Sequence, residues 1–255
     1  MGEAKRRRQA LAGAFSQLQG ELSSLGVNTE EFGFYDQEAF LVAERREPDF
    51  LEKYAQWVLL RPMDHQYRAR VSELVPRLSK MIVEEFQEYG MQGGCVAASG
   101  MLTRVLDRLG IWSFAVSGSL TLEVKRHGLR RTLHSVDKLD FPGAALGHAW
   151  VVAPPFTIVD ATISLQHWQH DEMGAYVPEY VIADDHTAKL MRPAVHDVVS
   201  NEFRDEYFVR EGRNDPNLHY RLEPRLRAFG TNFPAMNVIL GDLELHYAPV
   251  AVRQT

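Results

Sequence analysis

Cysteine is the residue that this 255-residue sequence most clearly lacks, because Cys95 is the only one. A single cysteine excludes an internal disulfide and any zinc site that needs two or more thiolates. It is also typical of proteins from reducing compartments, so we expect a cytoplasmic protein. Whether Cys95 is an inert core residue or a nucleophile therefore depends on the residues around it.

Long hydrophobic runs and an excess of basic residues are also missing. No stretch of about eighteen apolar residues is present, so we expect no membrane span, and no hydrophobic run of a secretory signal follows the basic residues Lys5 to Arg8. The net charge is -6, from 28 basic and 34 acidic side chains, which disfavours a nucleic-acid partner. Dinucleotide-binding and P-loop motifs are absent, so nothing supports nucleotide chemistry.

The patterns that are present predict an α+β fold, with helices first and an antiparallel sheet afterwards. We divide the chain into a basic, partly helical segment, residues 1–45, and a larger domain, residues 46–255. Helical spacing predicts helices at about 48–60, 71–89 and 95–109, with Pro76 kinking the second or lying in its first turn. Further along we expect strands at about 111–124, 148–152, 157–160, 175–183 and 237–247, a loop at 125–138 and a helix at 195–209.

Cys95 occupies the first position of the third predicted helix, directly after Gly93 and Gly94. Backbone N–H groups at a helix start have no intrahelical partner, and the helix dipole is positive there, so both favour a thiolate. The glycines permit a tight turn and a close approach to the sulfur. The helix should end at Gly110 and bury one apolar stripe, made of Ala98, Met101, Leu102, Val105, Leu106 and Leu109.

A base and its orienter follow on two predicted strands. His148 lies in Gly-His-Ala-Trp-Val-Val, and Asp160 lies twelve residues later in Ile-Val-Asp-Ala-Thr. A short turn near Pro154 and Pro155 would pair these strands and bring Asp160 opposite His148. Cysteine, histidine and aspartate are the nucleophile, base and orienting group that thiol chemistry requires.

These motifs, in the order Cys, His and Asp, resemble the core of the transglutaminase-like superfamily of papain-related cysteine enzymes, over residues 90–165. The Gly-Gly-Cys sequence and the leucines of the helix that ends in Leu109-Gly110 are also similar to the arylamine N-acetyltransferase core. The resemblance implies a papain-like fold in which the helix of Cys95 packs on an antiparallel sheet. It also implies a catalytic triad of Cys95, His148 and Asp160.

Two other residues are candidates for the same site, each with an alternative interpretation. Gln92, three residues before Cys95, is either a second oxyanion donor beside the Cys95 N–H or an ordinary surface residue. Trp150 either packs the core beside His148 or contacts substrate. The spacing of His167, His170 and Asp171 permits a metal ligand set but offers no clear third ligand, so we expect no metal site and no cofactor.

The function that this combination predicts is acyl transfer through a Cys95 thioester, with hydrolysis of an amide as the expected outcome, as in a peptidase or deamidase. The substrate would be a peptide, a protein or a small amide. Transfer to an amine, as in a transglutaminase, and acetyl-CoA-dependent N-acetylation are alternatives of the same chemistry. A binding module that keeps the fold without catalysis is the alternative from another class.

Overall fold

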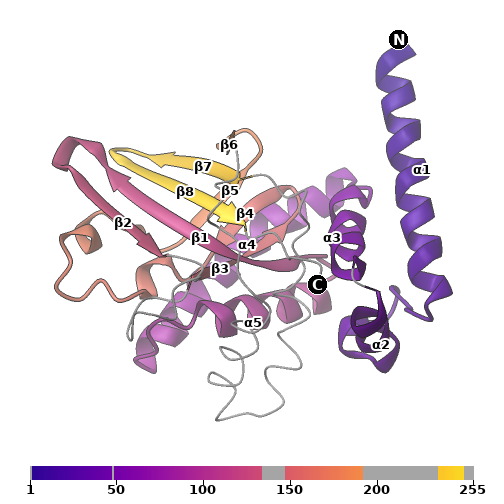
Figure 1. Ribbon diagram of the computed structural model, residues 1–255, viewed down its shortest axis with the longest axis horizontal. Helices are drawn as coiled ribbons and strands as arrows, with labels where there is room; N and C mark the ends of the chain where they lie inside the picture. The colour runs from indigo at the N-terminus through magenta and orange to yellow at the C-terminus, as the bar shows by residue number, and fades with distance from the viewer. Residues whose placement is uncertain (1, 48, 134–146, 192–234, 250–255) are drawn as a thin grey trace.

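The computed structural model describes residues 2–47, 49–133, 147–191 and 235–249, and Figure 1 shows their arrangement. It is a mixture of helices and antiparallel strands, which confirms the α+β class. Five α-helices are described: α1 (Gly2–Ser24), α2 (Glu38–Arg46), α3 (Phe50–Leu60), α4 (His65–Glu88) and α5 (Cys95–Arg108). Eight strands are described: β1 (Phe114–Val124), β2 (Leu129–Leu133), β3 (His148–Ala153), β4 (Phe156–Asp160), β5 (Val181–Asp184), β6 (Ala188–Met191), β7 (Ala235–Leu240) and β8 (Leu243–Pro249). Four 3-10 turns are also described: η1 (Phe34–Asp36), η2 (Lys125–His127), η3 (Ile163–Leu165) and η4 (Glu172–Ala175).

The N-terminal helices α1, α2 and α3 lie at one side of the sheet (Figure 1), and aromatic rings contribute much of their buried core. Helix α1 packs against α3, and the Trp57 indole of α3 donates a hydrogen bond of 2.6 Å to Gln19 of α1. Phe40 and Phe50 meet edge to face with ring centroids 4.7 Å apart, and both are fully buried. Buried rings of this kind are the main source of hydrophobic stabilisation for such a small helical layer.

Helix α4 begins earlier than the apolar pattern predicts. It starts at His65 rather than Val71 because Asp64 caps it, accepting a hydrogen bond of 2.7 Å from the backbone N–H of Tyr67. Pro76 therefore lies inside the helix and not in its first turn, which corrects that alternative.

Helix α5 has the predicted ends. The N–H of Gly110, whose φ is +69°, bonds to the Asp107 carbonyl, and the N–H of Ile111 bonds to the Leu106 carbonyl, which is a Schellman motif. The predicted buried stripe is only half right, because Ala98, Leu102 and Leu106 are buried whereas Met101, Val105 and Leu109 are exposed. The narrower stripe packs against α4 and against Val151 and Val159 of the sheet.

The described strands form one antiparallel sheet in the order β5-β4-β3-β1-β8-β7-β6, with β2 paired to β1. Strand β1 is long enough to have different neighbours along its length. Residues 114–118, its first half, pair with β3. Residues 118–124, its second half, pair with β8 on one edge, and residues 120–124 pair with β2 on the other edge. Gly118 lies opposite both His148 and Pro249, so one strand connects the two halves of the sheet.

Several sequence predictions for the sheet need correction. The predicted loop at 125–138 contains β2, which pairs with β1 through the turn at Gly128. The single predicted strand at 237–247 is a hairpin, β7 and β8, that turns at Gly241 with φ of +59°. Of the predicted strand at 175–183, only the end is extended, in β5. The predicted helix at 195–209 lies outside the described residues.

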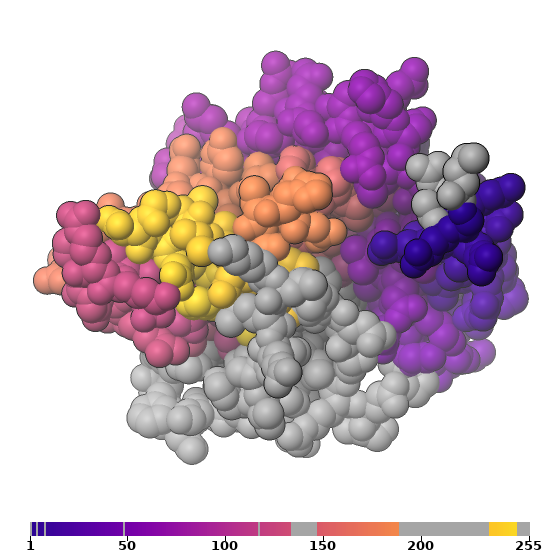
Figure 2. All heavy atoms as spheres, turned by 90° about the horizontal axis from the view of Figure 1, so that it is seen from above, coloured from indigo at the N-terminus to yellow at the C-terminus, as the bar shows by residue number. Residues whose placement is uncertain are grey.

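The β7–β8 hairpin, yellow in Figure 2, lies at the molecular surface beside the β1–β2 hairpin in pink. None of the helices in the described ranges is long and apolar enough to cross a membrane.

Candidate active site

The three predicted catalytic residues lie at the ends of three elements. Cys95 is the first residue of α5, His148 is the first residue of β3, and Asp160 is the last residue of β4. Helix α5 packs on β3, and β3 pairs with β4 through Val151 opposite Val159. The structure thus brings together residues that are separated by up to 65 positions in the chain.

Asp160 holds the imidazole of His148 directly. The Nε2 atom of His148 lies 2.6 Å from Oδ2 of Asp160, and both side chains are completely buried. The Tyr247 hydroxyl, from β8, donates to the same Oδ2 atom at 3.0 Å. The other oxygen, Oδ1, accepts from the backbone N–H of Thr162 at 3.0 Å and from its hydroxyl at 3.3 Å. Burying a carboxylate is costly unless it is paired and hydrogen-bonded, and Asp160 meets both conditions.

Cys95 is close enough to the imidazole to affect its proton affinity. Burial lowers the pKa of His148, but the charge of Asp160, its hydrogen bond and a smaller contribution from Cys95 outweigh burial and raise the pKa to about 10. Because Asp160 engages Nε2, the nitrogen that remains for Cys95 is Nδ1, which has no hydrogen bond of standard geometry. Proximity without good alignment is common in catalytic pairs before substrate binds.

The charge state that follows is an imidazolium at neutral pH. This cation lies beside the sulfur atom of Cys95 at the start of α5. Burial and Asp160 also keep the pKa of the Tyr247 hydroxyl well above 10, so Tyr247 stays neutral and acts as a donor.

The turn before Cys95 is shaped by two glycines with different roles. Gly93 has a φ of +69°, which favours glycine, and its N–H bonds to the Leu165 carbonyl at 2.8 Å. Gly94 has an ordinary φ of -80°, but a Cβ there would lie 2.6 Å from the ring of Phe86. Gly93 fixes the turn, and Gly94 lets the start of α5 approach α4 closely.

The two additional candidates have different surroundings. Gln92 is exposed in the turn before α5, and its role as an oxyanion donor stays a prediction. Trp150 is fully buried; its ring stacks beside His148, with centroids 6.4 Å apart, and meets Tyr247 edge to face. Trp150 therefore packs the core beside the base, and its alternative role in substrate contact stays a prediction.

Sequence reasoning missed two partners of Asp160. Thr162 follows Asp160 by two positions, a spacing at which aspartate side chains often bond to nearby backbone N–H groups, so the local signal was present. Tyr247 lies 87 residues away from Asp160 in sequence, and nothing local connects them. The Tyr247 hydroxyl reaches Asp160 because β8 pairs with β1 in the sheet.

A cavity of about 220 Å³ lies elsewhere, around Arg61, whose guanidinium is stacked between Trp57 and Trp112. None of the three catalytic candidates lines it. Within the described ranges, His167, His170 and Asp171 form no group with metal-ligand spacing, and Asp171 pairs with Arg131 instead.

No family model, curated protein or solved structure matches this chain. The site must be interpreted from its own geometry. A cysteine, an imidazole and a buried carboxylate in series can form a covalent acyl intermediate and move the protons that this requires.

Proposed function

We propose that this protein is a thiol-dependent enzyme that hydrolyses amides through a thioester on Cys95. The observation that carries the proposal is the buried pair of His148 and Asp160, 2.6 Å apart, beside the cysteine that begins α5. The helix on an antiparallel sheet is compatible with the papain-like, transglutaminase-like fold, and we propose that fold for the chain.

The proposed reaction has two stages. The Cys95 thiolate attacks the carbonyl carbon of an amide and forms a C–S bond; the C–N bond then breaks as His148 gives its Nδ1 proton to the leaving amine. Water then attacks the thioester while His148 takes a proton from it. The C–S bond breaks, a carboxylic acid leaves, and the thiolate and imidazolium are restored.

Two other groups have supporting roles in this proposal. Asp160 keeps the imidazole oriented and stabilises its positive charge in both stages. The backbone N–H of Cys95, at the first position of α5, lacks an intrahelical acceptor and is one donor for the oxyanion. Gln92 is the candidate for the second donor.

A small activated ester tests the chemistry without knowledge of the natural substrate. With p-nitrophenyl acetate we expect a burst of nitrophenol and an acetyl group on Cys95, identified by intact-protein and peptide mass spectrometry. Cys95→Ser should abolish the thioester, and His148→Ala should slow acylation by about a hundredfold or more, as expected for general acid–base groups.

The fate of the acetyl group then separates hydrolysis from transfer. In a hydrolase the thioester disappears in buffer alone, with steady release of acetate. A thioester that persists until an amine is added would contradict hydrolysis and indicate a transferase. Absence of acylation, with Cys95 unlabelled in the folded protein, would indicate a binding module.

Alkylation of Cys95 by iodoacetamide tests the charge state separately. The rate at about pH 6 should be high relative to the rate at about pH 9, because the imidazolium of His148 favours the thiolate. His148→Ala should lower the ratio of the two rates about tenfold or more, toward the behaviour of an ordinary thiol. Limited access to the buried sulfur slows alkylation at both pH values, so it does not affect the ratio of the two rates. A ratio that is the same in His148→Ala and in the wild type would contradict the proposed ion pair.

A further inference from the structure

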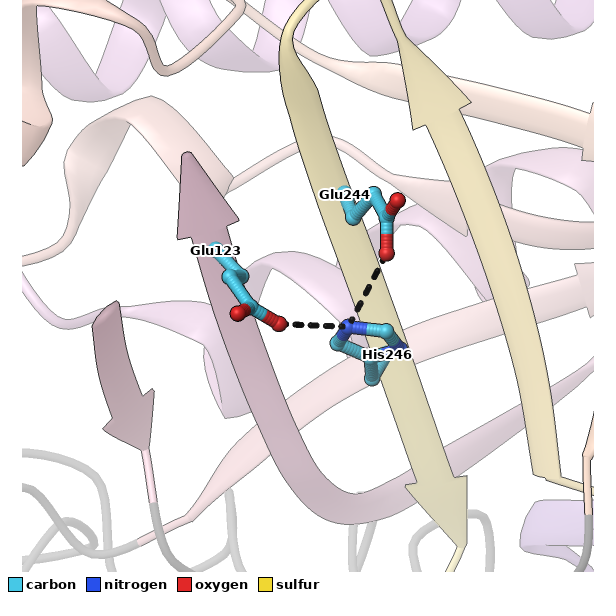
Figure 3. A group of neighbouring side chains, drawn as sticks. All are labelled: Glu123, Glu244 and His246. Carbon is cyan, nitrogen blue, oxygen red and sulfur yellow. Dashed lines mark ion pairs between the residues drawn. The ribbon is translucent and has the colours of Figure 1, made fainter. Parts of the chain in front are cut away.

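A second group of titratable side chains lies on the other half of the sheet, away from Cys95. It comprises Glu123 of β1 and Glu244 and His246 of β8, and we call it the β1–β8 cluster. Glu123 lies directly opposite Glu244 in the ladder, and His246 is two residues along β8 from Glu244. All three side chains therefore project from one face of two hydrogen-bonded strands, as Figure 3 shows.

Both carboxylates point at the same nitrogen. The Nε2 atom of His246 lies 3.7 Å from Oε2 of Glu123 and 3.7 Å from Oε2 of Glu244, and the three ligand atoms lie within 4.8 Å of one another (Figure 3). These separations are too long for hydrogen bonds. They are close to those of atoms that share an ion, because ligands about 2.1 Å from a tetrahedral Zn²⁺ lie roughly 3.4 Å apart.

The other nitrogen of His246 is already bonded. Its Nδ1 atom makes a short hydrogen bond with Oδ1 of Asn237, which lies directly opposite His246 on β7. An amide oxygen accepts, so Nδ1 is the donor of this bond, and Nε2 is the ring nitrogen that faces the two carboxylates. A partner on the second nitrogen is the usual way in which proteins orient a metal-binding histidine.

We propose that the β1–β8 cluster binds a divalent transition-metal ion of the Zn²⁺ class, through Nε2 of His246 and one oxygen of each glutamate. One nitrogen and two carboxylate oxygens suit a borderline ion better than Ca²⁺ or Mg²⁺, which prefer oxygen ligands alone. The three side chains are 20%, 21% and 30% exposed, so water can complete the coordination.

Lys125 supplies a further feature of the site. Its ammonium group bonds at 2.7 Å to Oε1 of Glu244, the oxygen that does not face His246. Lys125 therefore competes with a metal ion for the charge of Glu244 without occupying the position between the ligand atoms. Removing this ammonium should strengthen metal binding, whereas removing any ligand should weaken it.

The test titrates the full chain with Zn²⁺ by calorimetry near neutral pH, and with Co²⁺ by visible absorption. We expect one equivalent to bind, and a Co²⁺ spectrum without the charge-transfer band of a thiolate ligand, which separates this site from Cys95. Glu123→Gln and His246→Ala should each weaken binding at least about tenfold, and Asn237→Ala about tenfold, through loss of ring orientation. Lys125→Ala should strengthen it about threefold.

His186→Ala is the matched control, because His186 is an exposed histidine beside Asp184 and Asp185, and it should leave the affinity unchanged. Circular dichroism shows whether each variant is folded, and Glu123→Gln, which changes a half-buried side chain by one atom, keeps the test valid if His246→Ala unfolds. Absence of binding, or binding that Glu123→Gln and Lys125→Ala leave unchanged, would overturn the proposal. So would a charged His246 imidazole by nuclear magnetic resonance in the presence of excess Zn²⁺.

Discussion

At the scale of single residues, Asp160 is the centre of the candidate active site. It has no accessible surface. One of its oxygens contacts the imidazole of His148 and accepts a hydrogen bond from Tyr247, and the other accepts a hydrogen bond from Thr162. An isolated carboxylate in such a position would take up a proton rather than stay charged. These partners offset the cost of burying the Asp160 carboxylate, which holds the imidazole of His148 in place.

Tyr247→Phe tests the contribution of the hydroxyl that sequence reasoning missed. The substitution removes one donor to a buried charged acceptor, so we expect the free energy of unfolding to fall by about 2 kcal/mol, measured by urea denaturation. The rate of acylation by p-nitrophenyl acetate should fall as well, because Asp160 then holds His148 less firmly.

Tyr54→Phe is the matched control, because the Tyr54 hydroxyl is also buried but donates to a neutral acceptor, the Ser113 carbonyl, at 2.9 Å, and not to Asp160. It should cost about 1 kcal/mol and leave acylation unchanged. If both variants acylate at the wild-type rate, Tyr247 has only a structural role.

The residues of the site differ in how far sequence could predict them. Cys95, His148 and Asp160 were found because each lies at the end of an element whose pattern is visible locally. Tyr247 could not be found, because its role depends on which strand lies next to β1. Strand order is set by the packing of the whole sheet, and one sequence carries no direct record of it.

At the scale of elements, the start of α5 depends on how closely it approaches α4. Phe86 is buried against Ala98 and Leu165, and a Cβ at residue 94 would lie 2.6 Å and 3.1 Å from two of its ring atoms. A phenylalanine ring cannot bend away as the end of a lysine can. Either Phe86 or the first turn of α5 must move, and Cys95 is the next residue.

Gly94→Ala should therefore lower the free energy of unfolding by about 1–3 kcal/mol, the usual cost of overpacking, and slow the acylation of Cys95. Gly13→Ala is the matched control, because Gly13 lies inside α1 with nothing near its missing Cβ. The same substitution there should increase stability by about 0.5–1 kcal/mol. The two opposite signs are measured by urea denaturation.

Phe86→Leu shows whether the clash with Phe86 is the cause. In a double-mutant cycle the cost of Gly94→Ala should shrink in the Phe86→Leu background, because the smaller side chain leaves room. Equal costs in both backgrounds would mean that the glycine is needed for another reason.

Helices and strands with a clear local sequence pattern were predicted well. Helix α5 and strands β3 and β4 have strong periodicity and clear stops, and they lie where the sequence places them. The apolar residues Met101, Val105 and Leu109 suggested a wider buried stripe than α5 has. The periodicity shows which residues are apolar, but it does not show how much of the helix surface the neighbouring elements cover. The Gly241 turn was missed because apolar residues typical of strands lie on both sides of it, at 238–240 and 243–247.

At the scale of the whole molecule, one strand links two sites with different chemistry. The first half of β1 pairs with β3, which carries His148, and the second half carries Glu123 opposite Glu244. On β8, Tyr247 bonds to Asp160, whereas its neighbour His246 belongs to the β1–β8 cluster. Because successive side chains point to opposite faces of a strand, two adjacent residues can serve the two sites.

The pH dependence of global stability is a prediction of the whole molecule that follows from His148. Its pKa is raised from 6.5 to about 10 in the folded protein, so the folded state holds a proton that the unfolded state has lost between these values. This stabilisation is fully present below about pH 6.5 and disappears as the pH rises through about 10. As the pH rises from about 6.5 to about 10, loss of the His148 contribution should lower the free energy of unfolding by up to about 1.4 kcal/mol per pH unit.

Asp160→Asn should reverse this contribution, because burial alone lowers the pKa of a histidine. The variant's stability should then rise with pH near 6.5, where the wild type begins to lose stability. Urea denaturation of both proteins from about pH 6 to 10 measures the difference, in which the tyrosines and lysines common to both cancel. Parallel curves would mean that His148 is neutral in the folded protein, and the proton that the proposed mechanism gives to the leaving amine would have to come from another group.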